Sequence, residues 1–554
     1  MSSRDLRQKF LDFFKKKGHK IVPSSSLIPT DPSVLFTTAG MQQFKSYYLG
    51  EKSPYGLNVA SCQKCFRTSD IETVGDESHL TFLEMLGNFS FGDYFKEKAI
   101  ELAYQFLFKE LKLPLNEAVF TVFGGEKDIP EDEESVEIWQ KLGIPENQIK
   151  KCGREDNFWG PTGNEGPCGP TTEVHFKGTE VWNLVFNEYY QDEKEKLTPL
   201  KQKGVDTGMG LERLAMIIQK KPSVFETDLF EPIIKEIPAG NEKMRRIIAD
   251  HIKSAVFLIS EGILPSNVER GYVLRRILRR AIRYSKLLGQ EKQFLIPLAQ
   301  KVIEIYKDVY PEIKSQEADI LTVIQNEEEK FEKTLEAGLK EVDRMIASEM
   351  GPTGAAAFDI YQTHGFPLEM TEEIVLEKGK KIKNREEFLI LSKKHQEISR
   401  AGAESKFGGG GEFSPKLHTA THLLHAALRQ ILGNHVKQMG SDINPQRLRF
   451  DFSHPQKIAE AEIKDVENLV NQKIKENLEV KKEEMKYEEA LKSGALAFFK
   501  EKYPEKVTVF SIGNFSKEIC AGPHVKKTSE LGQFKIIKEE SSGAGTRRIR
   551  AILQ

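Results

Sequence analysis

The sequence predicts an α+β protein of three or four domains, and three observations support this fold class. The chain has 554 residues, which is too long for a single hydrophobic core. Its first part alternates short apolar runs with glycines and prolines, whereas helical patterns follow one another from Met244 onward. The glycine run Gly408–Gly411 has the composition of a flexible joint, so a further unit is expected after it.

The composition limits what the protein can bind and where it works. The net charge is −2 although 30% of the residues are charged, so a nucleic-acid-binding surface must come from local clusters of basic residues. The five cysteines are too few for a disulfide framework and suit a reducing compartment. Neither a signal peptide nor a run of about 18 apolar residues is present, so we expect a soluble, cytoplasmic protein without membrane contact.

The N-terminal part is predicted to contain an amphipathic helix followed by strands. Residues 6–17 carry a helical apolar stripe that Gly18 ends. Two further strands are expected to enclose a polar loop, residues 68–78, which would bring Arg67 and His79 close together. Cys62 and Cys65 have CxxC spacing without a second pair nearby, so two thiols beside a strand are favoured over a zinc or redox site.

A rigid wall and a buried strand are predicted next. Residues 161–170 are rich in glycine and proline, which suits a stiff loop. Residues 180–186 form an apolar run that is interrupted by Asn183. A buried amide needs a hydrogen-bond partner, and either a structural partner or a ligand would satisfy it.

The segment Gly204–Ala215 is predicted to be a strand that turns into a helix. Gly208 and Gly210 would let the backbone turn and approach a ligand, and the helix would follow over residues 211–218. The segment lacks the third glycine of a dinucleotide fingerprint and the lysine of a P-loop. It brings Asp206 and Arg213 to one site, although, taken alone, the segment is better explained as a strand-turn-helix with an ordinary surface salt bridge.

An arginine-rich helix is expected in the helical part. Its arginines are spaced by one and four residues, on the side opposite an apolar stripe, and no acid interrupts them: Arg275, Arg276, Arg279, Arg280 and Arg283. A solvated charged face is the common explanation for such a run. Five like charges without interleaved acids nevertheless favour a phosphate backbone as partner. Residues 315–350 are predicted to form a long bracing helix.

The last unit contains a possible metal site. His418 and His422 lie four residues apart on a predicted helix that reaches Ile431, so they share one face. Cys520 and His524 follow on a loop, because Pro523 argues against a helix there. Three imidazoles and a thiolate form a tetrahedral zinc ligand set, which would be either catalytic or purely structural. His425 is interpreted as a packing residue.

Taken together, these segments resemble the alanyl-tRNA synthetases. The similarity runs in order through nearly the whole chain, in TFLEMLGNFSFGDYFK, DNFW, GPCGP, VWNLVF, VDTGMGLER, LPSNVERGYVLRRILRRA, HTATHLLHAALR and CAGPH. The resemblance implies a class II synthetase with an antiparallel catalytic sheet. The implied domains are a catalytic domain at 1–237, a helical tRNA-acceptor domain at 238–406, a glycine-rich linker at 407–411 and a zinc-dependent α+β editing domain at 412–554.

The resemblance also implies roles in the activation of alanine by ATP. Arg67 and Arg213 would hold the nucleotide phosphates, usually with Mg²⁺, and Asp206 would bind the substrate ammonium group with Asn183 beside it. The other implied pocket residues are His79, Trp159, Val181, Trp182 and Gly210. Fixed guanidinium groups suit this chemistry because the alanine carboxylate attacks the α-phosphorus in line and no general base is required.

The resemblance extends to RNA and to editing. The arginines at 275–283 would bind the acceptor stem of tRNA(Ala). Lys286 and Gln362 stand where relatives carry Asn and Asp, near the region that recognises the acceptor-stem wobble pair. Zn²⁺ bound by His418, His422, Cys520 and His524 would serve the hydrolysis of seryl- and glycyl-tRNA(Ala). Relatives usually have a dimerising domain after the editing domain, whereas this sequence ends at Gln554, where that domain would begin. We therefore expect a monomer.

Two other functional classes compete with this one. A free-standing deacylase would contain only a unit like residues 412–554, and a non-catalytic RNA-binding descendant would not need Arg67, Asn183, Asp206 and Arg213 together. Alanine-dependent ATP–pyrophosphate exchange is expected only for the synthetase.

Overall fold

The protein is described by a computed structural model that covers residues 1–126, 129–290, 293–404, 414–444, 447–454, 456–496, 506–520, 522–543 and 546–554. The chain forms two compact units, Met1–Lys333 and Thr334–Gln554. The expected linker 407–411 lies outside the described residues, and the domain boundaries expected on either side of 238 and 407 stay predictions. None of the helices in the described ranges combines the length and apolar character that crossing a lipid bilayer demands.

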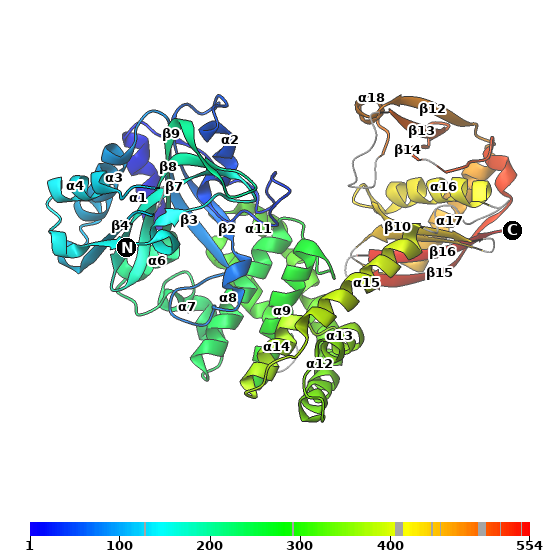
Figure 1. The fold of residues 1–554 in the computed structure, drawn as a ribbon. Helices are drawn as coiled ribbons and strands as arrows, with labels where there is room; N and C mark the ends of the chain where they lie inside the picture. The colour runs from blue at the N-terminus through cyan, green and yellow to red at the C-terminus, as the bar shows by residue number, and fades with distance from the viewer. Residues whose placement is uncertain are drawn as a thin grey trace. The chain divides into compact units, whose positions relative to one another are not determined.

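The first unit is built on a mostly antiparallel sheet with the order β1-β2-β3-β9-β8-β7-β4-β5, and β6 pairs with β7 (Figure 1). Only the pairs β1–β2 and β4–β5 in this described sheet are parallel. The strands are β1 (Lys20–Ile21), β2 (Asn58–Phe66), β3 (Phe82–Phe91), β4 (Ala118–Phe123), β5 (Ile149–Cys152), β6 (Phe158–Trp159), β7 (Gly166–Phe176), β8 (Thr179–Gln191) and β9 (Leu197–Gly210).

Helices surround this sheet and continue after it. They are α1 (Ser3–Lys16), α2 (Lys45–Tyr48), α3 (Lys96–Tyr104), α4 (Glu133–Lys141), α5 (Arg154–Asn157), α6 (Leu211–Ile218), α7 (Glu231–Glu236), α8 (Glu242–Ser260), α9 (Glu269–Leu287), α10 (Leu295–Tyr306), α11 (Pro311–Ser315) and α12 (Glu317–Ala347). Short 3-10 turns are η1 (Gly40–Phe44), η2 (Thr68–Ile71), η4 (Leu115–Glu117), η5 (Glu146–Gln148) and η6 (Val224–Glu226), and η3 (Gln105–Glu110) is a π-helical turn.

An aromatic core holds α1 and the segment after α3 against one face of the sheet. Phe10, Phe14 and Phe106 surround the indole of Trp182, with ring centroids 5.8–6.4 Å from it. All four side chains are buried. Because this core covers one face of strands β8 and β9, the alternate residues of these strands remain available on the other face.

Several predicted elements have the expected bounds. The first helix ends just before Gly18, which has a φ of +89°, and the helix after the glycine pair spans Leu211–Ile218. The expected stiff loop at 161–170 is only partly correct, because β7 already begins at Gly166. Glycine allows this strand to lie close to β8, since a Cβ at Gly169 would collide with the carbonyl oxygen of Phe186.

The second unit contains helices and two smaller sheets. Its helices are α13 (Gly354–His364), α14 (Leu368–Glu377), α15 (Arg385–Glu404), α16 (Ser414–Leu432), α17 (Glu460–Lys475) and α18 (Tyr487–Lys492), with the turn η8 (Thr528–Leu531). One sheet has the order β10-β11-β16-β15, and the other has the order β12-β13-β14. The strands are β10 (Gln438–Asn444), β11 (Arg447–Ser453), β12 (Val480–Lys486), β13 (Lys506–Ile512), β14 (Ser516–Ile519), β15 (Phe534–Gly543) and β16 (Thr546–Leu553).

The core of this second unit fixes the position of α16. Leu423, Leu424 and Leu428 are buried in one apolar cluster with Phe450 of β11 and Ile549 of β16. The helix that carries His418 and His422 is therefore a rigid support, as a preformed metal site requires.

Candidate functional site

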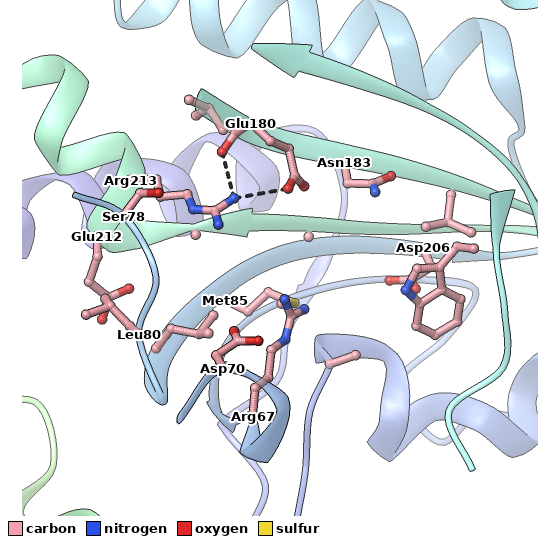
Figure 2. Close-up of a pocket in the computed structure, with 17 residues that line it drawn as sticks. Arg67, Asp70, Ser78, Leu80, Met85, Glu180, Asn183, Asp206, Glu212 and Arg213 are labelled. Atoms are coloured by element: carbon pink, nitrogen blue, oxygen red, sulfur yellow. Dashed lines mark hydrogen bonds and ion pairs between the residues drawn. The ribbon is translucent and has the colours of Figure 1, made fainter. Parts of the chain in front are cut away.

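A pocket of about 190 Å³ lies against the large sheet (Figure 2). Its wall comes from β3, β8, β9, the start of α6, and the loop between β2 and β3. The lining residues are Ala39, Arg67, Asp70, Ser78, Leu80, Leu83, Met85, Trp159, Glu180, Val181, Asn183, Val185, Asp206, Gly208, Gly210, Glu212 and Arg213. The pocket thus unites Arg67, Trp159, Val181, Asn183, Asp206, Gly210 and Arg213 from the expected set.

The two-residue period of β8 decides which of its side chains reach the pocket. Val181, Asn183 and Val185 line it, whereas Trp182 and Leu184 belong to the aromatic core on the other face. Trp182 is fully buried there. Its expected place in the nucleotide and alanine pocket is therefore wrong, because the strand points adjacent residues to opposite faces.

Asn183 presents an unsatisfied acceptor to the pocket. Its Nδ2 donates to Glu173 Oε1 at 2.8 Å, and the other oxygen of that carboxylate, Oε2, lies 2.8 Å from His175 Nε2. The buried Oδ1 of Asn183 has no partner among the described residues. Because a buried acceptor without a partner costs free energy, this oxygen is poised to accept a hydrogen bond from a ligand.

Asp206 is a nearly buried carboxylate without a counter-charge. The residue is 5% exposed, and its carboxylate forms no hydrogen bond or ion pair within the described ranges. Burial raises its pKa to about 7, because a low-dielectric site disfavours the charged form. In the antiparallel β8–β9 pair, Asn183 stands opposite Gly208 and Val185 stands opposite Asp206. Asn183 and Asp206 are therefore diagonal neighbours on one face of the sheet, a relation in which backbone positions are about 7–8 Å apart.

Arg213 lies toward the other end of the pocket from Asp206 (Figure 2). Its Nη1 donates to the carbonyl oxygen of Glu180 at 3.1 Å and to the carboxylate Oε2 at 3.0 Å, and its side chain is 24% exposed. The preceding Gly210 has a φ of −66°, which any residue can adopt, so the expected sharp glycine turn is absent at this position. A Cβ there would meet only the Arg213 side chain at ordinary contact distance, which leaves room for a ligand against the backbone.

Arg67 and His79 stand near the two ends of the loop between β2 and β3, but only Arg67 lines the pocket. Arg67 Nε donates to the carbonyl oxygen of Thr38 at 3.2 Å. His79 Nδ1 instead lies 2.5 Å from Asp76 Oδ2, whose carboxylate also accepts the His79 backbone N–H. The expected role of His79 in the ATP pocket is therefore not supported, since its ring is engaged within its own loop while Ser78 and Leu80 face the cavity.

Sequence reasoning missed several pocket residues, of which the acidic ones matter most. Asp70, Glu180 and Glu212 all line the cavity. Glu212 is fully buried and forms an ion pair with Lys253 Nζ at 2.7 Å. The position of Glu212 directly before Arg213 in the sequence was the available signal for this residue. Its partner Lys253 lies on α8, forty-one residues further along the chain.

The expected exposed arginine face at 275–283 is wrong. Arg275, Arg279, Arg280 and Arg283 are all buried. Arg275 Nε and Arg279 Nη2 lie 3.2 Å and 2.6 Å from Oε1 of Glu327, a buried acid on α12. Acids from elsewhere in the chain thus pair with this run, since the stretch 275–283 contains none.

Two arginines of α9 contact the loop between β2 and β3. Arg276 pairs with the Glu72 carboxylate, and Arg280 donates to the carbonyl oxygen of Ile71 at 2.7 Å. A contribution of these residues to tRNA binding stays a prediction, but an open anion-binding surface no longer supports it.

The expected ligand cluster of the second unit is assembled. One ligand atom from each of His418, His422, Cys520 and His524 lies within 4.8 Å of the others. Burial lowers the pKa of His418 to about 4, of His524 to about 2, and also that of His422. Neutral imidazoles are the form that coordinates a metal.

The cluster fits a zinc ion on three further observations. Bond lengths of about 2.0–2.3 Å place tetrahedral ligand atoms roughly 3.3–3.8 Å apart, and Cys520 Sγ lies 3.4 Å from His418 Nε2. Thr419 Oγ1 contacts Nδ1 of His524 at 3.1 Å, while the buried Nε2 of His524 has no partner among the described residues. Gly522 lies against the His418 ring so closely that a Cβ would collide with it.

The cysteines of the CxxC pair are part of β2. Cys62 Sγ lies 3.5 Å from Glu84 Oε1, and Cys65 is fully buried. Burial raises the pKa of both thiols, that of Cys65 to about 12. Both therefore stay protonated, which suits neither metal binding nor redox chemistry.

Comparison with known proteins relates both sites to synthetases. Residues 5–426 match the family model "tRNA synthetases class II (A)", and residues 507–550 match "Threonyl and Alanyl tRNA synthetase second additional domain". A solved pyrrolysyl tRNA synthetase from Desulfitobacterium hafniense aligns with 40% of this chain and 71% of its own at 15% identity and a TM-score of 0.26.

Curated relatives cover the whole chain. The alanine–tRNA ligase of Treponema denticola is 48% identical over 99% of this chain and 98% of its own length. That of Borrelia hermsii is 47% identical over the full length of both chains. The alanine–tRNA ligase of Thermotoga maritima is 41% identical, and the match covers 100% of this chain but 80% of the relative, which is longer.

Proposed function

Because the chain belongs to the alanine–tRNA ligases, a family of class II synthetases, we propose that its sheet-face pocket joins alanine to AMP at the expense of ATP. The activated alanine is then transferred to tRNA(Ala). The partners are accordingly alanine, ATP and tRNA(Ala). A free-standing deacylase does not fit, since the class II family match begins at residue 5 and the relatives match over the whole length.

The state of Asp206 is the observation that carries this proposal. A buried carboxylate without a counter-charge beside an unsatisfied amide oxygen is complementary to an ammonium group. In our proposal the alanine ammonium group forms an ion pair with Asp206 and donates a hydrogen bond to Asn183 Oδ1. The methyl group of alanine would then face the apolar lining, in which Val185 and Trp159 take part.

Arg67 and Arg213 would bind the nucleotide in this proposal. Arg213 is partly exposed and held by Glu180, so its remaining donors can point at a phosphate. Two fixed guanidinium groups would stabilise the charge that develops when the alanine carboxylate attacks the α-phosphorus and pyrophosphate leaves. Asp70 and Glu180 offer the hard oxygen atoms that suit Mg²⁺, which would supply further neutralisation of the phosphates when bound.

Alanine-dependent ATP–pyrophosphate exchange without tRNA tests this assignment. The wild-type protein is expected to incorporate labelled pyrophosphate into ATP only when alanine is present. Exchange that is equal with and without alanine, or absent altogether, would contradict alanine activation in this pocket.

The cluster in the second unit would remove wrongly charged serine and glycine. Glycine underfills an alanine pocket and serine adds one hydroxyl, differences that a binding site discriminates only about 10–200-fold. His418, His422, Cys520 and His524 would hold Zn²⁺, which supplies a Lewis acid that orients the aminoacyl end of tRNA or activates water. Glu518 lies behind this cluster, 3.6 Å from His422 Nε2 and 2.9 Å from His425 Nδ1, and would fix the orientation of both rings.

The protein is expected to act as a monomer. Light scattering at micromolar concentration should give a mass near the 63.0 kDa of one chain. A mass of twice that value would contradict the expectation.

A further inference from the structure

The loop between β2 and β3, residues 67–81, forms one wall of the nucleotide pocket only at its two ends. Arg67 and Asp70 line the pocket at the beginning of the loop, and Ser78 and Leu80 line it near the end. The intervening residues do not line the pocket, and several of them contact α8 and α9 instead. Because the ends of the loop line the pocket while its middle contacts α8 and α9, we expect these two helices to determine the conformation of the loop.

A continuous chain of buried hydrogen bonds joins the two ends of this loop. Arg280 Nη1 donates to the carbonyl oxygen of Ile71 at 2.7 Å and contacts His251 Nε2 at 3.0 Å. His251 Nδ1 lies 2.9 Å from Asp250 Oδ2.

The chain closes on the other end of the loop. Asp250 accepts the Thr81 N–H through Oδ1 at 2.9 Å and the Thr81 hydroxyl through Oδ2 at 2.5 Å. Asp250, His251 and Thr81 are completely buried, and Arg280 is 3% exposed. Hydrogen bonds that involve charged groups are strong in such a site, and removal of one partner leaves the other unsatisfied.

Further contacts hold the middle of the loop. Arg246 of α8 donates through Nη1 to the carbonyl oxygen of Gly75 and to Glu77 Oε1, both at 3.3 Å. Arg276 of α9 pairs with Glu72. Gly75 has a φ of +122°, and a Cβ there would lie 2.7 Å from Cγ of Lys243, so the backbone runs against α8 without space for a side chain.

We propose that α8 and α9 position the pocket loop for ATP, with Arg246, Arg280 and Thr81 as positioning residues. This inference rests on the proposed function of the pocket and specifies how that pocket is kept in shape. The arginines of α9 then matter before any RNA is bound, because Arg67 and Asp70 can reach the nucleotide only when Ile71 and Thr81 are held. An acceptor-stem contact alone would leave the reaction with ATP and alanine untouched.

The two adjacent arginines of α8 provide a matched test. Arg245 and Arg246 have side chains that are 16% and 15% exposed, and both donate to backbone carbonyl groups. Arg245 donates to Ile234 and Ile237 near α7, whereas Arg246 donates to the loop. In exchange assays without tRNA, R246A should raise the KM for ATP about tenfold and leave the KM for alanine within about twofold, and R245A should change neither.

Thr81 gives a second, conservative pair. Thr81→Val keeps the shape but removes the hydroxyl that Asp250 accepts, and Thr81→Ser keeps the hydroxyl. T81V should again raise the KM for ATP about tenfold, and T81S should restore it to near the wild-type value. A role in general stability would instead lower the melting temperature without separating the two KM values.

Hydrogen–deuterium exchange of the peptide that covers residues 67–81 completes the test without depending on activity. The loop should exchange faster in R246A and T81V than in R245A and T81S. Equal exchange protection and equal KM for ATP within each pair would overturn the inference. A wild-type protein without alanine-dependent activity would contradict the proposed function instead, and the protection data would still decide whether the helices hold the loop.

Discussion

Burial favours the neutral form of ionisable groups both in the pocket of the first unit and in the His/Cys cluster of the second unit, but it shifts their pKa values in opposite directions. Both contain ionisable groups that are largely removed from water. In the pocket the group is an acid, Asp206, whose pKa burial raises to about 7. In the cluster the groups are bases, and burial lowers the pKa of His418 to about 4.

The difference follows from how long each missing partner stays. In the proposed function a substrate ammonium group would enter and leave in every turnover, so one carboxylate with a neighbouring hydrogen-bond acceptor would be sufficient. In the proposed function a metal ion would remain bound, and four ligand atoms accordingly lie close together, from a rigid helix and a glycine-containing loop. The comparison teaches that a buried acid can be complementary to one cationic group, whereas converging imidazole and thiol groups are complementary to a metal ion.

The largest effect is expected from removal of the acid. Asp206→Ala should lower alanine-dependent exchange roughly 30- to 5,000-fold, because a desolvated ammonium group loses about 2–5 kcal/mol with its charged partner. The measurement is kcat/KM for alanine in the exchange assay, with folding checked by circular dichroism. Asp192→Ala is the control, since this acid caps the turn between β8 and β9 outside the pocket. Exchange at the wild-type rate in the Asp206 variant would contradict the assignment of Asp206 as the partner of the alanine ammonium group.

Removal of the thiolate should affect only the second unit. Cys520→Ala is expected to weaken zinc binding and to slow the clearance of seryl-tRNA about 10–100-fold, while the charging of alanine stays normal. Zinc content by metal analysis and deacylation of seryl-tRNA are the two readouts. Cys152→Ala, which changes a cysteine outside the cluster, serves as the control. Clearance at the wild-type rate by a folded C520A protein would show that the metal is not needed for editing.

A smaller effect is expected from crowding of the cluster. Gly522→Ala places a methyl group where the His418 ring lies, so the ring must move away from the other ligands. We expect about a tenfold loss of zinc affinity, measured by competition with a chelator. Gly440→Ala is a matched control in the same unit, because its Cβ would meet only Asp451, at 3.8 Å. Equal zinc affinity of the two variants would mean that His418 does not bind the metal.

The sequence predicted much of the pocket because its residues occur in short, characteristic segments. Arg67, Asn183, Asp206 and Arg213 were all expected at the site, and all line the cavity. The helix over 211–218 and the helix that carries His418 were also expected with nearly correct bounds. In each case the information lies within about ten residues of the chain.

The errors share a physical cause, which is the contribution of residues that are distant in sequence. Trp182 was misplaced because an apolar run does not reveal which strand face the helices cover. The arginines of α9 were interpreted as an exposed face because their partner Glu327 lies on another helix, forty-eight residues after Arg279. Burial of a charged side chain depends on tertiary partners, and a helical spacing pattern contains no information about them.

The proton balance of alanine binding tests the central claim most directly. At pH 6 the free carboxylate of Asp206 is mostly protonated, because its pKa lies near 7. If this carboxylate is the partner of the ammonium group, alanine binding must ionise it and release about 0.9 proton at pH 6, but almost none at pH 8.5. Titration calorimetry in buffers of different ionisation enthalpy measures this number, and Asp206→Asn should abolish the pH-dependent release. Proton release that is the same at both pH values, or the same in the wild type and the Asn variant, would contradict the account.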